Sequence, residues 1–205
     1  MDLWTLERNC WAEGHELVCG CDEAGAGPLA GPVYAAAVIL PRELEIPGLN
    51  DSKKLTPKKR DGLYDIIVDQ AEAWSVAWVD HREIDETDIL SARMNAMQRA
   101  IDGLALRPDF ALIDGNRDHG RAGAIIPPHE TVIKGDSLSA SIAAASILAK
   151  VSRDRYMEEM AVQYPQYAFE RHKGYPTKLH YERLEEYGPS PIHRLTFLHK
   201  KRGRR

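Results

Sequence analysis

Two apolar segments near the N-terminus constrain the fold more than any other feature of the sequence. Residues 17–21 (LVCGC) and 32–40 (PVYAAAVIL) both have the character of buried strands, and only ten residues separate them. A helical crossover between parallel strands needs a dozen residues or more, so these two strands are predicted to pair antiparallel. A doubly wound sheet that is parallel throughout is therefore disfavoured.

The rest of the sequence alternates between strand-like and helix-like segments. Thr56 followed by Pro57 is typical of a helix start. In the segment 137–150, nine of the 14 residues are Ala or Ser. Such small side chains predict a helix packed very close to other backbone, and the segment is too short and too polar to span a bilayer. This alternation predicts an α/β protein with a mixed sheet. The expected helices are 57–72, 85–104, 137–164 and 177–188, and the further strands are 74–79, 110–114 and 131–134.

Composition narrows the class of protein. With 205 residues, 43% of them hydrophobic, the chain can form one medium-sized domain with a real core. Its three cysteines, Cys10, Cys19 and Cys21, cannot form a disulfide framework, which indicates a reducing compartment. Cys19 and Cys21 are expected to be buried rather than to bind metal. Residues 1–16 are too polar for a signal peptide, so we expect a soluble, cytoplasmic protein.

Charge is unevenly distributed. The formal net charge of −4 excludes a uniformly basic coat for nucleic acid. Residues 166–205, however, carry ten Lys and Arg against four Asp and Glu, and residues 52–60 (SKKLTPKKR) carry five basic residues in nine. Either run alone is typical of a solvated surface. Two such runs in an otherwise acidic chain fit a phosphate-binding groove better.

Four acidic residues fall at predicted element boundaries. Asp22 and Glu23 follow the first strand, Asp114 ends the strand 110–114, and Asp136 opens the Ala/Ser-rich helix. Strand ends at one sheet edge converge, and carboxylates that meet there would repel one another. A hard divalent cation such as Mg²⁺ or Mn²⁺ relieves that repulsion. The four positions together therefore predict a metal site.

Each of these acids also has a purely structural interpretation. Neighbours in a strand face opposite sides, so Asp22 and Glu23 can share an ion only if the chain bends at once, as Gly25 and Gly27 would allow. Asp114 stands in a common Asp-Gly turn pair, and Asp136 also fits a helix cap. The glycine-rich segment 22–32 can form an anion-binding nest but lacks the Gly-Lys-Ser/Thr of a P-loop.

Five segments stand out in order from residue 22 to residue 180: DEAGAGPLAGPV, LNDSKKL, FALIDGN, VIKGDSLSASIAAASILAKVSRD and HKGYPTKLH. Together they resemble the ribonuclease HII family, the type 2 ribonucleases H. The resemblance implies a ribonuclease H-like fold, with a five-stranded mixed sheet flanked by helices and a small helical C-terminal part. It divides the chain into an N-terminal extension (1–16), a catalytic domain (17–165), a helical substrate-binding part (166–198) and a basic tail (199–205).

The resemblance also assigns roles to residues. The four acidic metal ligands of the family fall on Asp22, Glu23, Asp114 and Asp136. A separate set corresponds to the substrate-binding residues of the family. Its Gly-Arg-Gly motif, which senses the ribonucleotide 2′-OH, falls on Gly25, Ala26 and Gly27, so the arginine is absent here. The tyrosine that stacks on a sugar falls on Tyr175, otherwise an ordinary turn residue, and the phosphate-contacting lysine falls on Lys53, otherwise a solvated loop charge.

The activity implied by this resemblance is hydrolysis of RNA within duplexes. The expected substrates are RNA/DNA hybrids and DNA duplexes containing ribonucleotides, nicked 5′ of a single ribonucleotide by two Mg²⁺ or Mn²⁺ ions to leave 5′-phosphate and 3′-hydroxyl ends. We expect a monomer with no membrane contact, and a replication-clamp contact cannot be read from the sequence. Two alternatives are a catalytically weak protein that binds hybrids and junctions, because Ala26 replaces the arginine, and an unrelated metal-dependent phosphotransfer enzyme.

Overall fold

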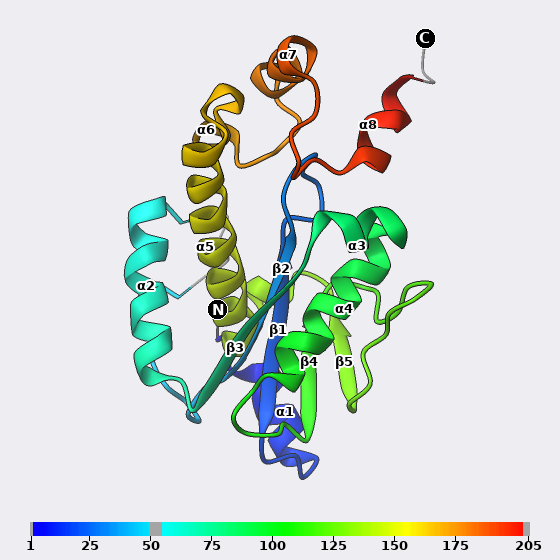
Figure 1. The fold of residues 1–205 in the computed structure, drawn as a ribbon. Coiled ribbons are helices and arrows are strands. Elements are labelled where there is room, and N and C mark those ends of the chain that lie inside the picture. Colours follow the sequence, from blue (N-terminus) through cyan, green and yellow to red (C-terminus); the bar gives the residue numbers. More distant parts are fainter. Residues whose placement is uncertain (1, 50–54, 203–205) are drawn as a thin grey trace.

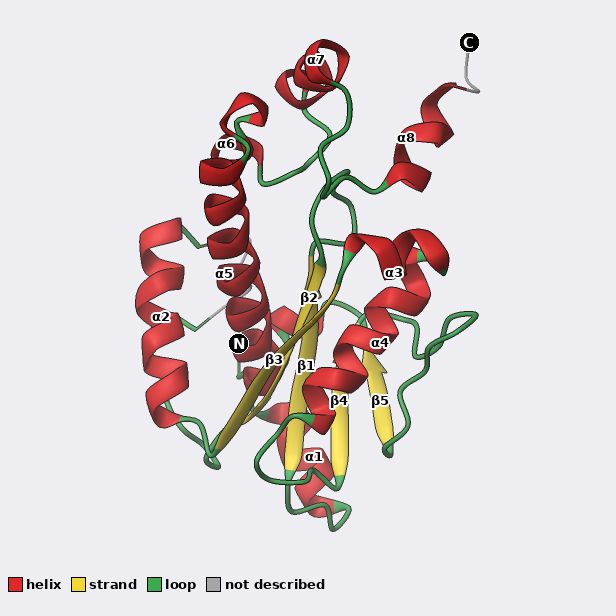
Figure 2. Ribbon diagram, in the orientation of Figure 1, coloured by secondary structure: helices red, strands yellow, loops and turns green. Residues whose placement is uncertain are grey.

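One five-stranded mixed sheet organises the chain (Figure 1, Figure 2). The computed structural model describes residues 2–49 and 55–202, and the strand order is β3-β2-β1-β4-β5. The first three strands along the chain pair antiparallel, whereas β4 and β5 run parallel to β1. The predicted mixed sheet is thereby confirmed. The strands are β1 (Val18–Ala24), β2 (Val33–Ile39), β3 (Ala73–Val79), β4 (Phe110–Asp114) and β5 (His129–Val132).

Helices cover both faces of the sheet. Helix α4 packs on one face, while α5 packs on the other with α2 outside it (Figure 1). The short helices that follow α5 lie beyond one end of the sheet, and the predicted boundary of a separate C-terminal part at residue 166 stays a prediction. No helix in the described ranges is long and apolar enough to cross a membrane. The helices are α1 (Thr5–Ala12), α2 (Pro57–Gln70), α3 (His81–Glu86), α4 (Ile89–Asp102), η2 (Gly135–Ser137), α5 (Ala140–Gln163), η3 (Pro165–Tyr167), α6 (Phe169–His172), α7 (Lys178–Tyr187) and α8 (Leu195–Arg202).

Helix α5 approaches the central strand as closely as the Ala/Ser-rich sequence predicts. A Cβ atom at Gly20 of β1 would lie 2.1 Å from the carbonyl carbon of Ser141, a distance that no real side chain tolerates. Ala143, Ala144 and Ala145 are completely buried, and Ala144 and Ala145 belong to the same core cluster as Ala36 and Val38 of β2. Small side chains on both elements therefore set the position of α5.

Several predicted boundaries are wrong. The helix expected over 85–104 is two helices, because Asp88 caps α4 by accepting from the N–H groups of Leu90 and Ser91. The strand expected over 131–134 is displaced to β5, and Lys134 has a left-handed φ of 59°. Helices α1 and α8 were not predicted. The capping of α2 by Thr56 and the burial of Cys19 and Cys21 are confirmed.

Candidate active site

Three of the four acidic residues lie at the carboxyl edge of the parallel strands. Asp22 lies in β1, Asp114 ends β4, and Asp136 lies in η2 just after β5. Cys21 of β1 pairs with Ile113 of β4, so Asp22 and Asp114, one residue further along each strand, lie at equivalent positions of the two neighbouring strands. The Gly135 N–H donates to Asp114 Oδ1 at 2.7 Å, which ties η2 to the end of β4. The fold therefore places these three acids along one edge of the sheet, and the metal site expected there stays a prediction.

The two consecutive acids of β1 face opposite sides of the sheet. Strand β1 continues through Ala24, so both acids lie within it rather than after it as expected, and the chain does not make the immediate bend that would let them share an ion. Asp22 shares the α5 side with Gly20 because side chains alternate along a strand. Glu23 lies on the α4 side, where its Oε1 is 2.6 Å from Nη2 of Arg93. The bend comes only at Gly25, with φ of 99°.

Asp136 does not cap the long helix. It is 4% exposed within the 3-10 turn η2, and Ser139 is the residue that caps α5, by accepting from the N–H of Ile142. The expected cap role for Asp136 is therefore wrong, because the helix starts three residues later than predicted.

The donor set suits a hard cation, although the side chains are not arranged around one. Across residues 2–49 and 55–202, no three His, Cys, Asp or Glu side chains form a cluster that could hold a metal ion in this conformation. The candidate ligands at this edge are nevertheless all carboxylates, and Asp22 and Asp136 are buried at 3% and 4% exposure. Oxygen-only donors fit Mg²⁺ or Mn²⁺ rather than softer ions.

The turn of residues 25–27 follows the acid-bearing strand without interruption. A Cβ atom at Gly27 would lie 3.8 Å from Cε1 of Tyr175, so the tyrosine ring borders this turn. The Leu29 N–H donates to the Gly174 carbonyl at 2.8 Å and fixes the two loops together. The structure thus brings the predicted ribose-sensing turn and the predicted stacking tyrosine side by side. Lys53 lies outside the described residues.

Two buried arginines that the sequence analysis did not single out hold the loop after β1. Arg153 and Arg194 are both fully buried, and each side chain donates three hydrogen bonds to backbone carbonyls. Burial lowers the pKa of Arg153 and lowers that of Arg194 to about 9. Arg153 also lies 5.7 Å from the centre of the Tyr175 ring. The one signal in the sequence is that Arg153 shares the i, i+4 stripe of α5 with Ala149 and Met157, both fully buried.

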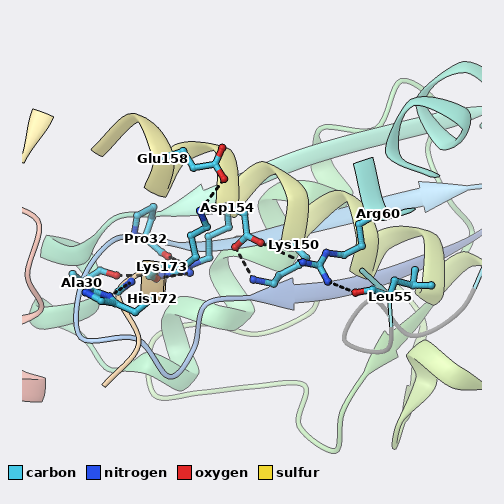
Figure 3. Close-up of polar contacts among 11 residues, drawn as sticks. Ala30, Pro32, Leu55, Arg60, Lys150, Asp154, Glu158, His172 and Lys173 are labelled. Carbon is cyan, nitrogen blue, oxygen red and sulfur yellow. Dashed lines mark hydrogen bonds and ion pairs between the residues drawn. The ribbon is translucent and has the colours of Figure 1, made fainter. Parts of the chain in front are cut away.

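The predicted basic face is partly neutralised. Lys150 and Asp154 form an ion pair of 2.6 Å on α5, Arg60 approaches the same carboxylate at 3.8 Å, and Lys173 pairs with Glu158 (Figure 3). These residues line a groove between α2, α5 and α6. Arg194, counted above among the basic residues of the C-terminal part, is buried and unavailable to phosphate.

Known proteins share this fold over nearly the whole chain. A ribonuclease H2 from Pyrococcus horikoshii OT3 superposes with a TM-score of 0.73 and 29% identity, over 88% of this chain and 93% of that one. The ribonuclease HII of Archaeoglobus fulgidus, solved in a complex with PCNA, gives 0.72 and 26% identity, over 88% and 94% of the two chains. The molecule is therefore a nuclease of the ribonuclease H-like fold.

Sequence comparison specifies the family. The family model Ribonuclease HII matches residues 19–201. A ribonuclease HII from Caldicellulosiruptor saccharolyticus is 53% identical over 201 residues, which is 96% of this chain and 94% of that protein. The chain belongs to the ribonuclease HII family and is an endoribonuclease, as members of this metal-dependent family are.

Proposed function

We propose that this enzyme cleaves the RNA strand of RNA/DNA hybrids and nicks duplex DNA 5′ of a single embedded ribonucleotide, leaving 5′-phosphate and 3′-hydroxyl ends. The observation that carries the proposal is the continuity between β1 and the turn of residues 25–27. Asp22 and Gly25 are three residues apart, so at most about 11 Å of chain separates them. One nucleotide and its scissile phosphate can bridge that distance.

The carboxylates are proposed to hold the metal ions. Asp22, Asp114 and Asp136 supply oxygen donors from the carboxyl edge of the sheet. Glu23, paired with Arg93 in this structure, is the fourth proposed ligand. When bound, two Mg²⁺ or Mn²⁺ ions lower the pKa of a coordinated water and offset charge on the phosphate. The carboxylates would hold the ions in position and need not act as general bases themselves.

Ribose selection is proposed to depend on backbone and ring contacts. A 2′-OH is what distinguishes RNA from DNA at one nucleotide. The turn formed by Gly25, Ala26 and Gly27 offers N–H donors to that hydroxyl, and the Tyr175 ring, 39% exposed beside the turn, is placed to stack on a sugar. Lys53 is proposed to contact phosphate. None of these contacts reads base sequence, so cleavage should depend on the sugar alone.

Family membership favours this enzyme over a catalytically weak protein that binds hybrids. Ala26 removes one side-chain contact from the turn, whereas all four carboxylates are present. We further propose that the protein works as a cytoplasmic monomer. A replication clamp is a candidate partner by analogy with the Archaeoglobus fulgidus protein in its complex with PCNA.

A panel of labelled duplexes tests the proposal. The protein is incubated with an RNA/DNA hybrid, a DNA duplex containing one ribonucleotide, and the matching all-DNA duplex, each with Mg²⁺, Mn²⁺ or a chelator. We expect cleavage of the first two substrates with either metal and of none with the chelator. Binding of the hybrid without cleavage in either metal would instead support the binding protein.

A further inference from the structure

Arg194 makes a set of contacts that a merely structural buried residue does not need. Its side chain is completely buried, and each nitrogen donates to a different carbonyl of the loop after β1: Nε to Gly31 at 2.9 Å, Nη1 to Ala26 at 3.1 Å and Nη2 to Gly25 at 2.7 Å. Within the described parts of the chain, no carboxylate lies within 4.0 Å of this guanidinium. Burying such a cation is costly, and an apolar residue would fill the space at lower cost.

Backbone hydrogen bonds hold the segment 192–194 against the loop after β1 and so place the Arg194 guanidinium among the carbonyls of that loop. His193 forms an isolated β-bridge with Ala30, and the Arg194 N–H donates to the Leu29 carbonyl at 2.8 Å. The Gly31 N–H in turn donates to the Ile192 carbonyl at 2.9 Å. The segment before α8 is thus bound along the loop by backbone hydrogen bonds, which leaves the arginine little freedom to choose other partners.

The consequence for the turn follows from peptide geometry. In a planar trans peptide, the carbonyl and the following N–H point in opposite directions. The carbonyls of Gly25 and Ala26 point at Arg194, so the N–H groups of Ala26 and Gly27 point away from it. Among the described residues, neither N–H donates to a protein acceptor. Two free donors therefore face outward on the turn that borders Tyr175.

We infer that Arg194 is a positioning residue for ribose selection: by holding the Gly25 and Ala26 carbonyls, it presents the Ala26 and Gly27 amides to the 2′-OH of the substrate. The inference rests on the proposed function, because it concerns the same turn. Positioning of the turn by Arg194 matters more in this chain than in one with arginine at position 26, because the side chain of Ala26 makes no substrate contact of its own.

Arg153 provides a matched control. It is equally buried and also donates to three carbonyls, those of Ala30, Pro32 and Lys173. The N–H groups that follow the Ala30 and Pro32 carbonyls are not free to bind a substrate. The Gly31 N–H donates to the Ile192 carbonyl, and Val33 is part of strand β2. Arg153 therefore supports the loop without presenting a free donor.

The test compares Arg194→Lys with Arg153→Lys. Lysine keeps the charge, but its three donors are on a single nitrogen and cannot reproduce contacts that Nε, Nη1 and Nη2 make with three separate carbonyls. The readout is binding selectivity: the dissociation constant for an all-DNA duplex divided by that for the same duplex with one ribonucleotide, with the melting temperature measured in parallel. Loss of one or two aligned N–H donors should lower this ratio about 3- to 10-fold in Arg194→Lys, while affinity for all-DNA stays within about 2-fold. Arg153→Lys should lose thermal stability and, because Arg153 also lies beside the Tyr175 ring, some affinity for both duplexes alike, so that the ratio is kept.

A second measurement needs no variant. In the wild-type protein, hydrogen exchange at the Ala26 and Gly27 amides should slow when the ribonucleotide duplex is added and should not slow with the all-DNA duplex. An unchanged ratio in Arg194→Lys, or an equal fall in both lysine variants, overturns the inference for Arg194 while leaving the proposed function standing. The absence of amide protection overturns the inference together with the proposed contact between the turn and the 2′-OH, but not the proposed cleavage. A wild-type ratio near one overturns the proposed function as well.

Discussion

The Nε2 atoms of His180 and His193 lie 2.9 Å apart, inside a directed chain of hydrogen bonds. The Ser190 N–H donates to His193 Nδ1, so a neutral His193 carries its proton on Nε2 and donates it to His180. His180 must then carry its proton on Nδ1, which donates to the Tyr175 carbonyl at 2.9 Å. Both histidines are therefore held neutral, each in one tautomer, behind the tyrosine proposed to stack on the sugar.

This arrangement predicts loss of stability in mild acid. Burial lowers the pKa of His180 to about 4 and that of His193 to about 3, and His172, stacked on His180, has a lowered pKa for the same reason. Because the unfolded histidines titrate near 6.5, the unfolded chain binds more protons below that pH. Their stabilisation is complete above about pH 6.5 and is lost as pH falls toward 4, by about 1.4 kcal/mol per pH unit for each histidine.

Urea unfolding at pH 7.5 and at pH 5.5 measures this effect. The free energy of unfolding should be lower at pH 5.5, and the difference should shrink in His180→Asn, which cannot take up the proton. An exposed histidine provides the control, since His119→Asn should keep the wild-type difference. Equal stability of the wild-type protein at both pH values would contradict the neutral histidine pair.

Substitutions at Tyr175 separate its ring from its hydroxyl. Tyr175→Phe should retain most of the affinity for a ribonucleotide-containing duplex, because the exposed ring beside Gly27 is the group proposed to stack. Tyr175→Ala should lose about 1–3 kcal/mol of binding free energy. Binding isotherms of both variants at one salt concentration decide the question, and equal losses would indicate a hydrogen-bonding role of the hydroxyl.

Asp136→Asn should abolish cleavage without loss of stability. Loss of a group that merely supports a metal ligand costs about 10- to 100-fold in activity, so loss of a ligand itself should cost more than about 100-fold. The amide has the same shape, and removing one charge from neighbouring carboxylates should leave the free energy of unfolding unchanged or higher. Asp22→Asn should behave alike. Near-normal turnover in either variant, measured on the single-ribonucleotide duplex, would remove that residue from the metal site.

Ala26→Arg tests what the absent arginine would add. Ala26 is partly exposed, and an arginine there can reach phosphate with a charge-assisted hydrogen bond of about 1.5–3 kcal/mol. We expect tighter duplex binding, with a dependence on salt steeper by about one counterion. The preference for ribose should not change, because it rests on the backbone of the turn. If discrimination against DNA appeared only in Ala26→Arg, the backbone account would be wrong.

Much of the sheet and of the helices around it could be predicted because the signals are local. The Thr56-Pro57 helix start, the apolar strand 110–114 and the small residues facing Gly20 all express their preference over a few neighbouring positions. The single helix predicted over 85–104 is interrupted at Thr87 and Asp88, because a helix cap forms there within a continuous apolar pattern.

The supporting residues of the site could not be predicted, because their roles depend on distant segments. Nothing near Arg194 in the sequence shows that it contacts a loop more than 160 residues away. His180 and His193 likewise acquire their tautomers only through pairing across a turn. Asp22 and Glu23 were predicted as ligands, but their placement on opposite faces required the observed length of β1.

The position of the nick tests the central claim most directly. A DNA duplex with one ribonucleotide, labelled at either end of the modified strand, is cleaved with Mg²⁺ and mapped at single-nucleotide resolution. We expect one nick immediately 5′ of the ribonucleotide, with a 3′-hydroxyl that a DNA polymerase can extend and a 5′-phosphate on the ribonucleotide. A nick 3′ of the ribonucleotide, or equal cleavage of the all-DNA duplex, would contradict the account.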